Sequence, residues 1–277
     1  MTTTVDAALR AAAAAGVDRL DAQLLLAEVL GQSRTWLFAH GDDAVPPAAL
    51  ARFQDWAGRR AAGEPFAYLV GRKEFHGLLL DVSPAVLVPR PDTETLVAWA
   101  LERIRELPAA RVADLGTGSG AIALALKHSE AGAHITATDV SPDALAVAQG
   151  NARRLALDVE FLAGPWWTPL AGRRFHVVAS NPPYIAGNDH HLAALAHEPR
   201  LALTPEGDGL RSLREIIDGA PAHLEPGGWL LLEHGHDQAA AVAQLLAGRG
   251  FTDVSTRHDL GGNARCTGGR CAKAASG

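Results

Sequence analysis

From Arg111 onward, short apolar segments alternate with helical patterns, and this alternation constrains the fold more than any other feature of the chain. Strands are expected in six such segments, at 112–115, 134–138, 159–162, 175–180, 230–232 and 251–256. Helices are expected after Gly120, after Pro142 and up to Gly248. Strands separated by helices pair in parallel, because a parallel connection has to cross the sheet. The pattern therefore predicts an α/β fold with a doubly wound, mostly parallel sheet.

The first 91 residues are organised differently. Residues 1–72 contain leucines at helical spacing and predict a small helical domain. Residues 73–91 predict a short β-hairpin that turns near His76-Gly77 and continues into a proline-rich linker. Residues 92–277 then form the α/β domain.

Composition excludes several classes of protein. With 277 residues, of which 48% are hydrophobic and 20% charged, the chain is not disordered. A net charge of −6 argues against binding nucleic acid through a basic surface. We see no secretory signal and no apolar run of about 20 residues, so we expect a soluble, cytoplasmic protein that does not enter a membrane. Cys266 and Cys271 are expected as reduced thiols, since they lack the spacing of a zinc site.

A glycine-rich loop follows the first expected strand, in the run Asp114-Leu115-Gly116-Thr117-Gly118-Ser119-Gly120. Glycine is needed where a tight turn from a strand into a helix lets a ligand approach the backbone. In a doubly wound sheet such a loop lies at the carboxyl edge, where nucleotides bind. The G-x-G-x-G spacing is not the G-x-G-x-x-G of dinucleotide sites, which favours S-adenosylmethionine as the ligand. A tight turn that binds nothing is the alternative.

The second expected strand ends at Asp139. A carboxylate at this position can accept hydrogen bonds from both hydroxyls of a ribose. Ser141-Pro142 follows, so the alternative is that Asp139 caps a helix or is solvated. Because Asp139 is expected beside the glycine loop, we prefer the ribose role.

The most informative stretch is Ser180-Asn181-Pro182-Pro183-Tyr184, at the end of the fourth expected strand. An amide nitrogen is a poor nucleophile, so its methylation requires an NH₂ group held with the nitrogen facing the methyl carbon. The side-chain oxygen of Asn181 and the backbone carbonyl of Pro182 can accept both amide protons and stabilise the charge that develops on nitrogen. We therefore predict a methyltransferase that acts on a planar amide or amine NH₂.

The two prolines explain how a backbone carbonyl becomes available. Pro182 and Pro183 have a fixed φ and favour an extended conformation in the residue before them, so the loop is stiff and its carbonyls stay outside regular structure. Tyr184 can stack on the planar target group. The alternative, a Pro-Pro turn with Asn181 as a turn residue, is disfavoured by its position after a cofactor loop. The reaction needs no metal.

Six short segments, spread along nearly the whole chain, have distinctive sequences. They are Val88 to Glu94, Asp114 to Gly120, Asn181 to Tyr184, Glu198 to Leu203, Asp208 to Leu210 and Leu232 to Gly235. Together they resemble the PrmC/HemK family of protein-(glutamine-N(5)) methyltransferases. The resemblance implies a class I methyltransferase-like fold. It also implies methyl transfer from S-adenosylmethionine to the glutamine of the G-G-Q motif in peptide chain release factors, which would be the protein partner.

The resemblance also implies roles for individual residues. Gly116 to Gly120, Asp139 and Trp166 would contact the cofactor, with Trp166 against the adenine. Asn181 to Tyr184 would hold the glutamine, with Asn181 also beside the cofactor, and residues 1–72 would help to recognise the release factor. One departure is Pro165, where the family often has an acidic residue, and the following Trp166-Trp167 pair leaves open which ring faces the adenine.

Other functions stay open at this point. A methyltransferase for an exocyclic amine of a base in DNA or RNA would use the same tetrapeptide, but it would have to flip the base out and bind phosphates. Residues 1–89 contain eight Lys/Arg against ten Asp/Glu, which disfavours such a role. A non-catalytic binding module is disfavoured by the intact loop and tetrapeptide. His190 and His191 are adjacent and cannot both face one metal ion if the segment is extended, so no metal site is predicted.

Overall fold

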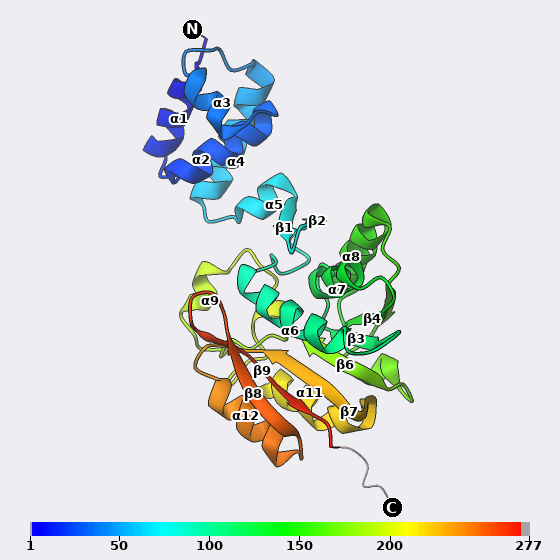
Figure 1. Cartoon of the computed structure of the whole chain (residues 1–277). Coiled ribbons are helices and arrows are strands. Elements are labelled where there is room, and N and C mark those ends of the chain that lie inside the picture. The colour runs from blue at the N-terminus through cyan, green and yellow to red at the C-terminus, as the bar shows by residue number, and fades with distance from the viewer. Residues whose placement is uncertain (1, 273–277) are drawn as a thin grey trace, which may run out of the picture. The chain divides into compact units, whose positions relative to one another are not determined.

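The computed structural model describes residues 2–272, which divide by their contacts into two compact units with the boundary between Arg72 and Lys73 (Figure 1). The first unit is helical, with α1 (Val5–Ala14), α2 (Arg19–Leu30), α3 (Arg34–Ala39), α4 (Pro47–Ala61) and α5 (Phe66–Val70). Asp18 caps the start of α2 by accepting from the backbone N–H of Leu20 at 2.8 Å.

A hairpin of β1 (Arg72–Phe75) and β2 (Leu78–Asp81) follows, as predicted around His76-Gly77, and all of it except Arg72 belongs to the second unit. Its other strands are β3 (Arg111–Leu115), β4 (His134–Asp139), β5 (Glu160–Ala163), β6 (Phe175–Ser180), β7 (Leu224–Glu233), β8 (Thr252–His258) and β9 (Ala264–Arg270). Its longer helices are α6 (Glu94–Ile104), α7 (Ala121–Ser129), α8 (Pro142–Leu155), α11 (Arg211–His223) and α12 (Ala239–Gly248). Short helices are the 3₁₀ turns η1 (Pro91–Thr93) and η2 (Thr168–Leu170), with α9 (His191–Ala194) and α10 (Arg200–Leu203).

Seven strands form one sheet in the order β5-β4-β3-β6-β7-β9-β8. All pairs from β5 to β7 are parallel, and only β9 runs antiparallel to its neighbours β7 and β8. The chain moves outward from β3 in one direction and then returns to continue in the other. This confirms the doubly wound, mostly parallel sheet that the alternation of strands and helices predicts.

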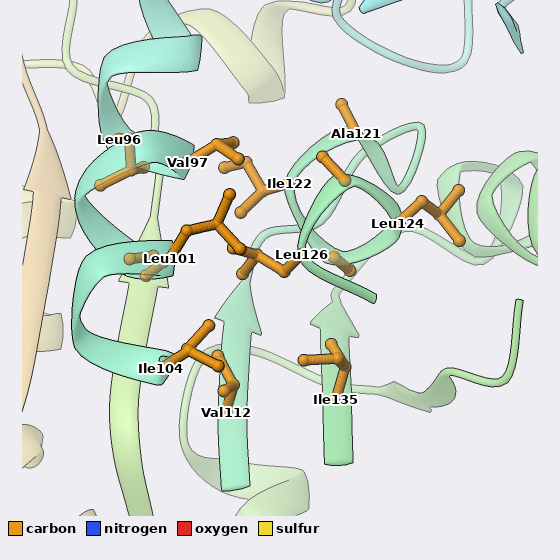
Figure 2. Close-up of a cluster of buried hydrophobic side chains, with 14 of the residues drawn as sticks. Leu96, Val97, Leu101, Ile104, Val112, Ala121, Ile122, Leu124, Leu126 and Ile135 are labelled. Carbon is orange, nitrogen blue, oxygen red and sulfur yellow. The ribbon is translucent and has the colours of Figure 1, made fainter. Parts of the chain in front are cut away.

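Both faces of this sheet are covered, so its central strands are buried on both sides. Helices α6 and α7 pack on one face, where their side chains lie over Val112 of β3 and Ile135 of β4 (Figure 2). Helices α11 and α12 cover the other face through Leu213, Ile216 and Val242, among others. The hairpin contributes Phe75, Leu78 and Leu80 to the first of these clusters, so one face of a segment expected in a linker packs in the core of the second unit.

The sequence did not predict strand β9 or helix α11, which packs on one face of the sheet. Strand β9 contains Gly268-Gly269, which lowers strand propensity. Gly268 is needed there because an added Cβ would lie 2.6 Å from Leu231 Cδ2 and 2.9 Å from Trp99. Helix α11 contains Pro221 near its end, which weakens the helical pattern.

Candidate active site

The strand register brings the predicted site residues to one edge of the sheet. Leu115 of β3 pairs with Thr138 of β4 and with Ser180 of β6, and Ser180 pairs with Leu232 of β7. In parallel strands the next residue of each strand therefore lies at the same level. Those next residues are Gly116, Asp139, Asn181 and Glu233.

Backbone hydrogen bonds hold the glycine loop against β4. The N–H groups of Gly116 and Thr117 both donate to the Thr138 carbonyl at 2.9 Å. Gly116, Gly118 and Gly120 all have positive φ values, of 73°, 56° and 84°. Only glycine adopts this region readily, which explains the three glycines at alternate positions.

Asp114, at the end of β3, is fully buried beneath this loop. One carboxyl oxygen accepts from the Thr117 hydroxyl at 2.6 Å and from the Ala123 N–H at 3.2 Å. The other, Oδ1, is buried without a hydrogen-bond partner among the described residues. Burial raises the pKa of Asp114 to about 7, against the lowering effect of those two hydrogen bonds.

Asp139 connects the two loops at the ends of β3 and β4. Its carboxylate accepts from the Gly118 N–H and from the Ser141 N–H, each at 2.9 Å. The hydroxyl of Ser141, rather than Asp139, caps α8, since it accepts from the Ala144 N–H at 3.2 Å. Each carboxylate oxygen keeps a lone pair for a further donor.

The adjacent tryptophans have different environments. Trp166 has a positive φ of 40°, and its ring lies at Gly116, where an added Cβ would be 3.2 Å from it. Its Nε1 donates to Glu215 of α11 at 3.0 Å. Trp167 packs on α11, stacking on His223 and donating to the Ile216 carbonyl at 3.1 Å.

The tetrapeptide after β6 is tied to three other elements. Asn181 Nδ2 donates to the Thr93 hydroxyl oxygen at 3.2 Å, and the Tyr184 hydroxyl donates to Glu233 Oε1 at 3.3 Å. Gln238 fixes the backbone of Tyr184 by donating to its carbonyl at 2.9 Å. Burial raises the pKa of the Tyr184 hydroxyl, so that group stays protonated and acts as a donor.

A single cavity of about 650 Å³ joins these features within the second unit. It is lined by most of the predicted site residues, namely Gly116, Thr117, Gly118, Ser119, Asp139, Trp166, Asn181 and Pro183. Gly120, Pro182 and Tyr184 are not among its lining residues. At Gly120 an added Cβ would lie 3.0 Å from Leu124 and 3.3 Å from Ala148, so the missing side chain makes room for helix packing. The roles of all these residues in binding stay predictions.

The proline-rich segment after the hairpin also lines the cavity, through Val86, Pro89 and Arg90, among others. Glu198, in the loop after β6, accepts from the Val88 N–H at 3.0 Å and forms an ion pair with the Arg90 guanidinium. The Glu198 side chain is almost fully buried. This carboxylate therefore holds the proline-rich segment to the loop that follows the tetrapeptide.

Sequence reasoning did not single out Thr93, Arg90, Glu198 or Glu215 as site residues. Thr93 and Glu198 are polar residues with little exposure, and burial of polar groups is visible only in the folded chain. Thr93 and Glu198 both lie in segments that resemble the PrmC/HemK family, and this resemblance was the signal in the sequence that could have identified them.

His190 and His191 do not meet the condition, an extended segment, under which the sequence excludes a shared metal ion. His190 and His191 lie at the start of α9 rather than in an extended segment, and both rings are beside Asp189, at 3.6 and 2.8 Å from Oδ1. Both histidine rings are well exposed. Exposed groups of this kind are common on protein surfaces, and nothing further follows from the cluster.

Known proteins are similar in sequence to most of this chain. Residues 4–71 match the family model of the PrmC N-terminal domain, and residues 93–211 match that of the methyltransferase small domain. A release factor glutamine methyltransferase of Bordetella pertussis is 51% identical over 257 residues, which are 92% of this chain and 95% of that protein. One of Xylella fastidiosa is 50% identical over 267 residues, with 95% and 97% covered.

A solved methyltransferase structure from Pyrococcus furiosus has the same fold. It is 18% identical, with a TM-score of 0.54 over 71% of this chain and 90% of that chain. Among residues 2–272, no helix has both the length and the apolar character needed to cross a membrane.

Proposed function

The chain belongs to the release factor glutamine methyltransferase family, and from this premise we propose that it methylates the side-chain amide nitrogen of the glutamine in the G-G-Q motif of peptide chain release factors. The methyl donor is S-adenosylmethionine. The observation that supports this most directly is that the glycine loop and Asn181 line the same cavity. A cofactor and a target amide can therefore meet there.

The residues present fit S-adenosylmethionine. The cavity volume of about 650 Å³ is in the usual range for sites of small molecules. Asp139 keeps free lone pairs that can accept from ribose hydroxyls, and Trp166 offers a ring for the adenine. When bound, this cofactor supplies a methyl group attached to a positively charged sulfonium.

The chain's own contribution is to hold the glutamine and to stabilise charge. Asn181 Nδ2 is engaged by Thr93, which leaves the side-chain oxygen to accept one amide proton. The Pro182 carbonyl accepts the second, so the nitrogen is held with its lone pair toward the methyl donor. Both oxygens stabilise the positive charge that develops on nitrogen, and the proton then leaves to water.

Residues 1–72 are proposed to recognise the release factor. Their surface has large exposed apolar side chains, since Phe38 is 64% exposed and Leu20 is 46% exposed. Both line a shallow depression together with Arg19 and Arg34. Apolar side chains next to arginines form a surface suited to a protein partner.

The test is mass spectrometry of a purified release factor after incubation with the protein and S-adenosylmethionine. We expect the G-G-Q peptide to gain the mass of one CH₂ group on its glutamine. Asn181→Ala should abolish this gain while S-adenosylmethionine binding, measured by calorimetry, persists. Asn188→Ala, an exposed asparagine in the following loop, is the matched control and should methylate normally. Transfer to added DNA or RNA, with none to the release factor, would refute the proposal.

A further inference from the structure

The mechanism depends on which end of the Asn181 amide faces the cavity. The oxygen and the NH₂ group of an asparagine side chain have nearly the same shape, and a half turn about the last bond exchanges them. With the oxygen toward the glutamine, Asn181 accepts an amide proton. With the NH₂ group there, two donors would face each other. Some neighbouring group must therefore select one orientation.

Thr93 is the group in contact with the amide. Its hydroxyl oxygen accepts from Asn181 Nδ2 at 3.2 Å, and its side chain is 4% exposed although it lines the cavity. A hydroxyl, however, can donate or accept. Thr93 selects the orientation of Asn181 only if the proton of its own hydroxyl is directed elsewhere.

Glu233 provides that second direction. Its carboxyl is 1% exposed and lies one residue beyond the strand pair that places Asn181, at the same level of the sheet. One of its oxygens accepts from the Tyr184 hydroxyl at 3.3 Å, and the other, Oε2, is buried without a hydrogen-bond partner among the described residues. Burial raises the pKa of Glu233 to about 7, whereas the Thr93 and Tyr184 hydroxyls, as donors beside the carboxyl, lower it.

From this arrangement we propose that Thr93 and Glu233 are positioning residues for methyl transfer. The Thr93 hydroxyl donates its hydrogen bond to the ionised Glu233 carboxylate, so toward Asn181 Nδ2 the Thr93 oxygen can only accept. The Asn181 oxygen is thereby turned toward the target glutamine. The inference rests on the proposed function, because it assigns a use to the orientation that the reaction requires.

A purely structural role explains the position of Thr93 less well. Thr93 immediately precedes α6, where a threonine hydroxyl commonly caps the helix by accepting from its first N–H groups. Here its backbone is helical, with φ −64° and ψ −19°, and the side chain makes no cap hydrogen bond. The hydroxyl is therefore used for Asn181 and not for the helix.

Thr93→Val tests the proposal, since valine keeps the shape and removes the hydroxyl. We expect kcat for release-factor methylation to fall about tenfold, the effect of losing one orienting hydrogen bond, with KM for S-adenosylmethionine within about twofold of wild type. Thr93→Ser, which keeps the hydroxyl, should restore kcat. Thr136→Val is the matched control, because Thr136 is also buried with one side-chain bond, to Glu160, and lies away from the cavity.

Glu233→Gln tests whether Thr93 and Glu233 act together on the Asn181 amide or act independently of each other. It should lower kcat by a similar factor, and the double variant with Thr93→Val should lose about tenfold rather than about a hundredfold, because both act through the same amide. Multiplicative losses would overturn the proposal. So would a Thr93→Val protein with the kcat of wild type.

An NMR measurement gives a result that does not depend on activity. In protein labelled with ¹⁵N-asparagine, the side-chain NH₂ signals of Asn181, assigned by their absence in Asn181→Asp, should shift and exchange faster with water in Thr93→Val but not in Thr93→Ser. Unchanged signals would refute the inference. If wild-type protein does not methylate the release factor, the proposed function fails, and this measurement still decides the orientation of the amide.

Discussion

Replacing Asp114 by asparagine should remove a large part of the pH dependence of stability. Burial raises the pKa of this carboxyl from 3.8 to about 7 in the folded protein. Between these values the folded state binds a proton that the unfolded state has lost, so the free energy of unfolding falls as the pH rises. The stabilising effect is fully present below the unfolded pKa and is lost as the pH passes the folded one.

The size of this effect follows from the two pKa values. They differ by about 3 units at 1.36 kcal/mol per unit, which gives about 4 kcal/mol over the whole range. From pH 5.5 to pH 8.5, only the last 1.5 units or so of this range contribute, which corresponds to about 2 kcal/mol. Asparagine does not titrate, so Asp114→Asn should lack this contribution.

Urea unfolding of wild type and Asp114→Asn at both pH values, without cofactor, measures the difference. The amide itself carries a constant cost, since one of its ends lacks a partner, but this cost cancels when the two pH values are compared. Between pH 5.5 and pH 8.5, the free energy of unfolding of wild type should fall by about 2 kcal/mol more than that of Asp114→Asn. Asp158→Asn, at an exposed position, should behave as wild type. Equal losses in wild type and Asp114→Asn would refute the reasoning.

Further predictions concern the walls of the cavity. Trp166→Ala should weaken S-adenosylmethionine binding about tenfold in calorimetry, because it removes the half-buried ring that lines the cavity at the glycine loop. Trp167→Ala should instead lower the free energy of unfolding by about 2 kcal/mol and leave the affinity nearly unchanged, and the reverse result would exchange their roles. Glu198→Ala should cost about 2 kcal/mol in urea unfolding, because it leaves the Val88 N–H and the Arg90 guanidinium without their partner. It should also weaken cofactor binding, and unchanged affinity would show that the proline-rich segment is held in another way.

The sequence was sufficient to predict the part of the fold that depends on local patterns. Strands β3, β4 and β6 are largely buried on both faces, and each ends at a residue that introduces a loop of unusual composition. Because parallel strands end at a common edge, the glycine loop, Asp139 and Asn181 could be assigned to one site before their distances were known. The different environments of Trp166 and Trp167 depend on their contacts with α11, a helix that the sequence did not reveal.

Strand β9 shows why other elements were not predictable. Its two glycines look unfavourable for a strand, yet a side chain at Gly268 would meet Leu231 and Trp99. The requirement for glycine comes from residues 37 or more positions away in the chain, and no local pattern contains it. Packing against the neighbouring strand and α6 decided the structure here, and propensity did not.

The same reasoning applies to the supporting residues of the site. Thr93 precedes its partner Asn181 by 88 positions, and Arg90 precedes Glu198 by 108. The motifs that sequence reasoning found are those whose chemistry lies within one loop. The residues that contact these motifs come from other parts of the chain, and Glu233 lies at the level of Asn181 because β6 and β7 are adjacent and in register. Since Glu233 is the last residue of β7 and lies at the level of Asn181, a polar residue at the carboxyl end of a buried parallel strand is a candidate positioning residue even where its chemistry suggests no direct role.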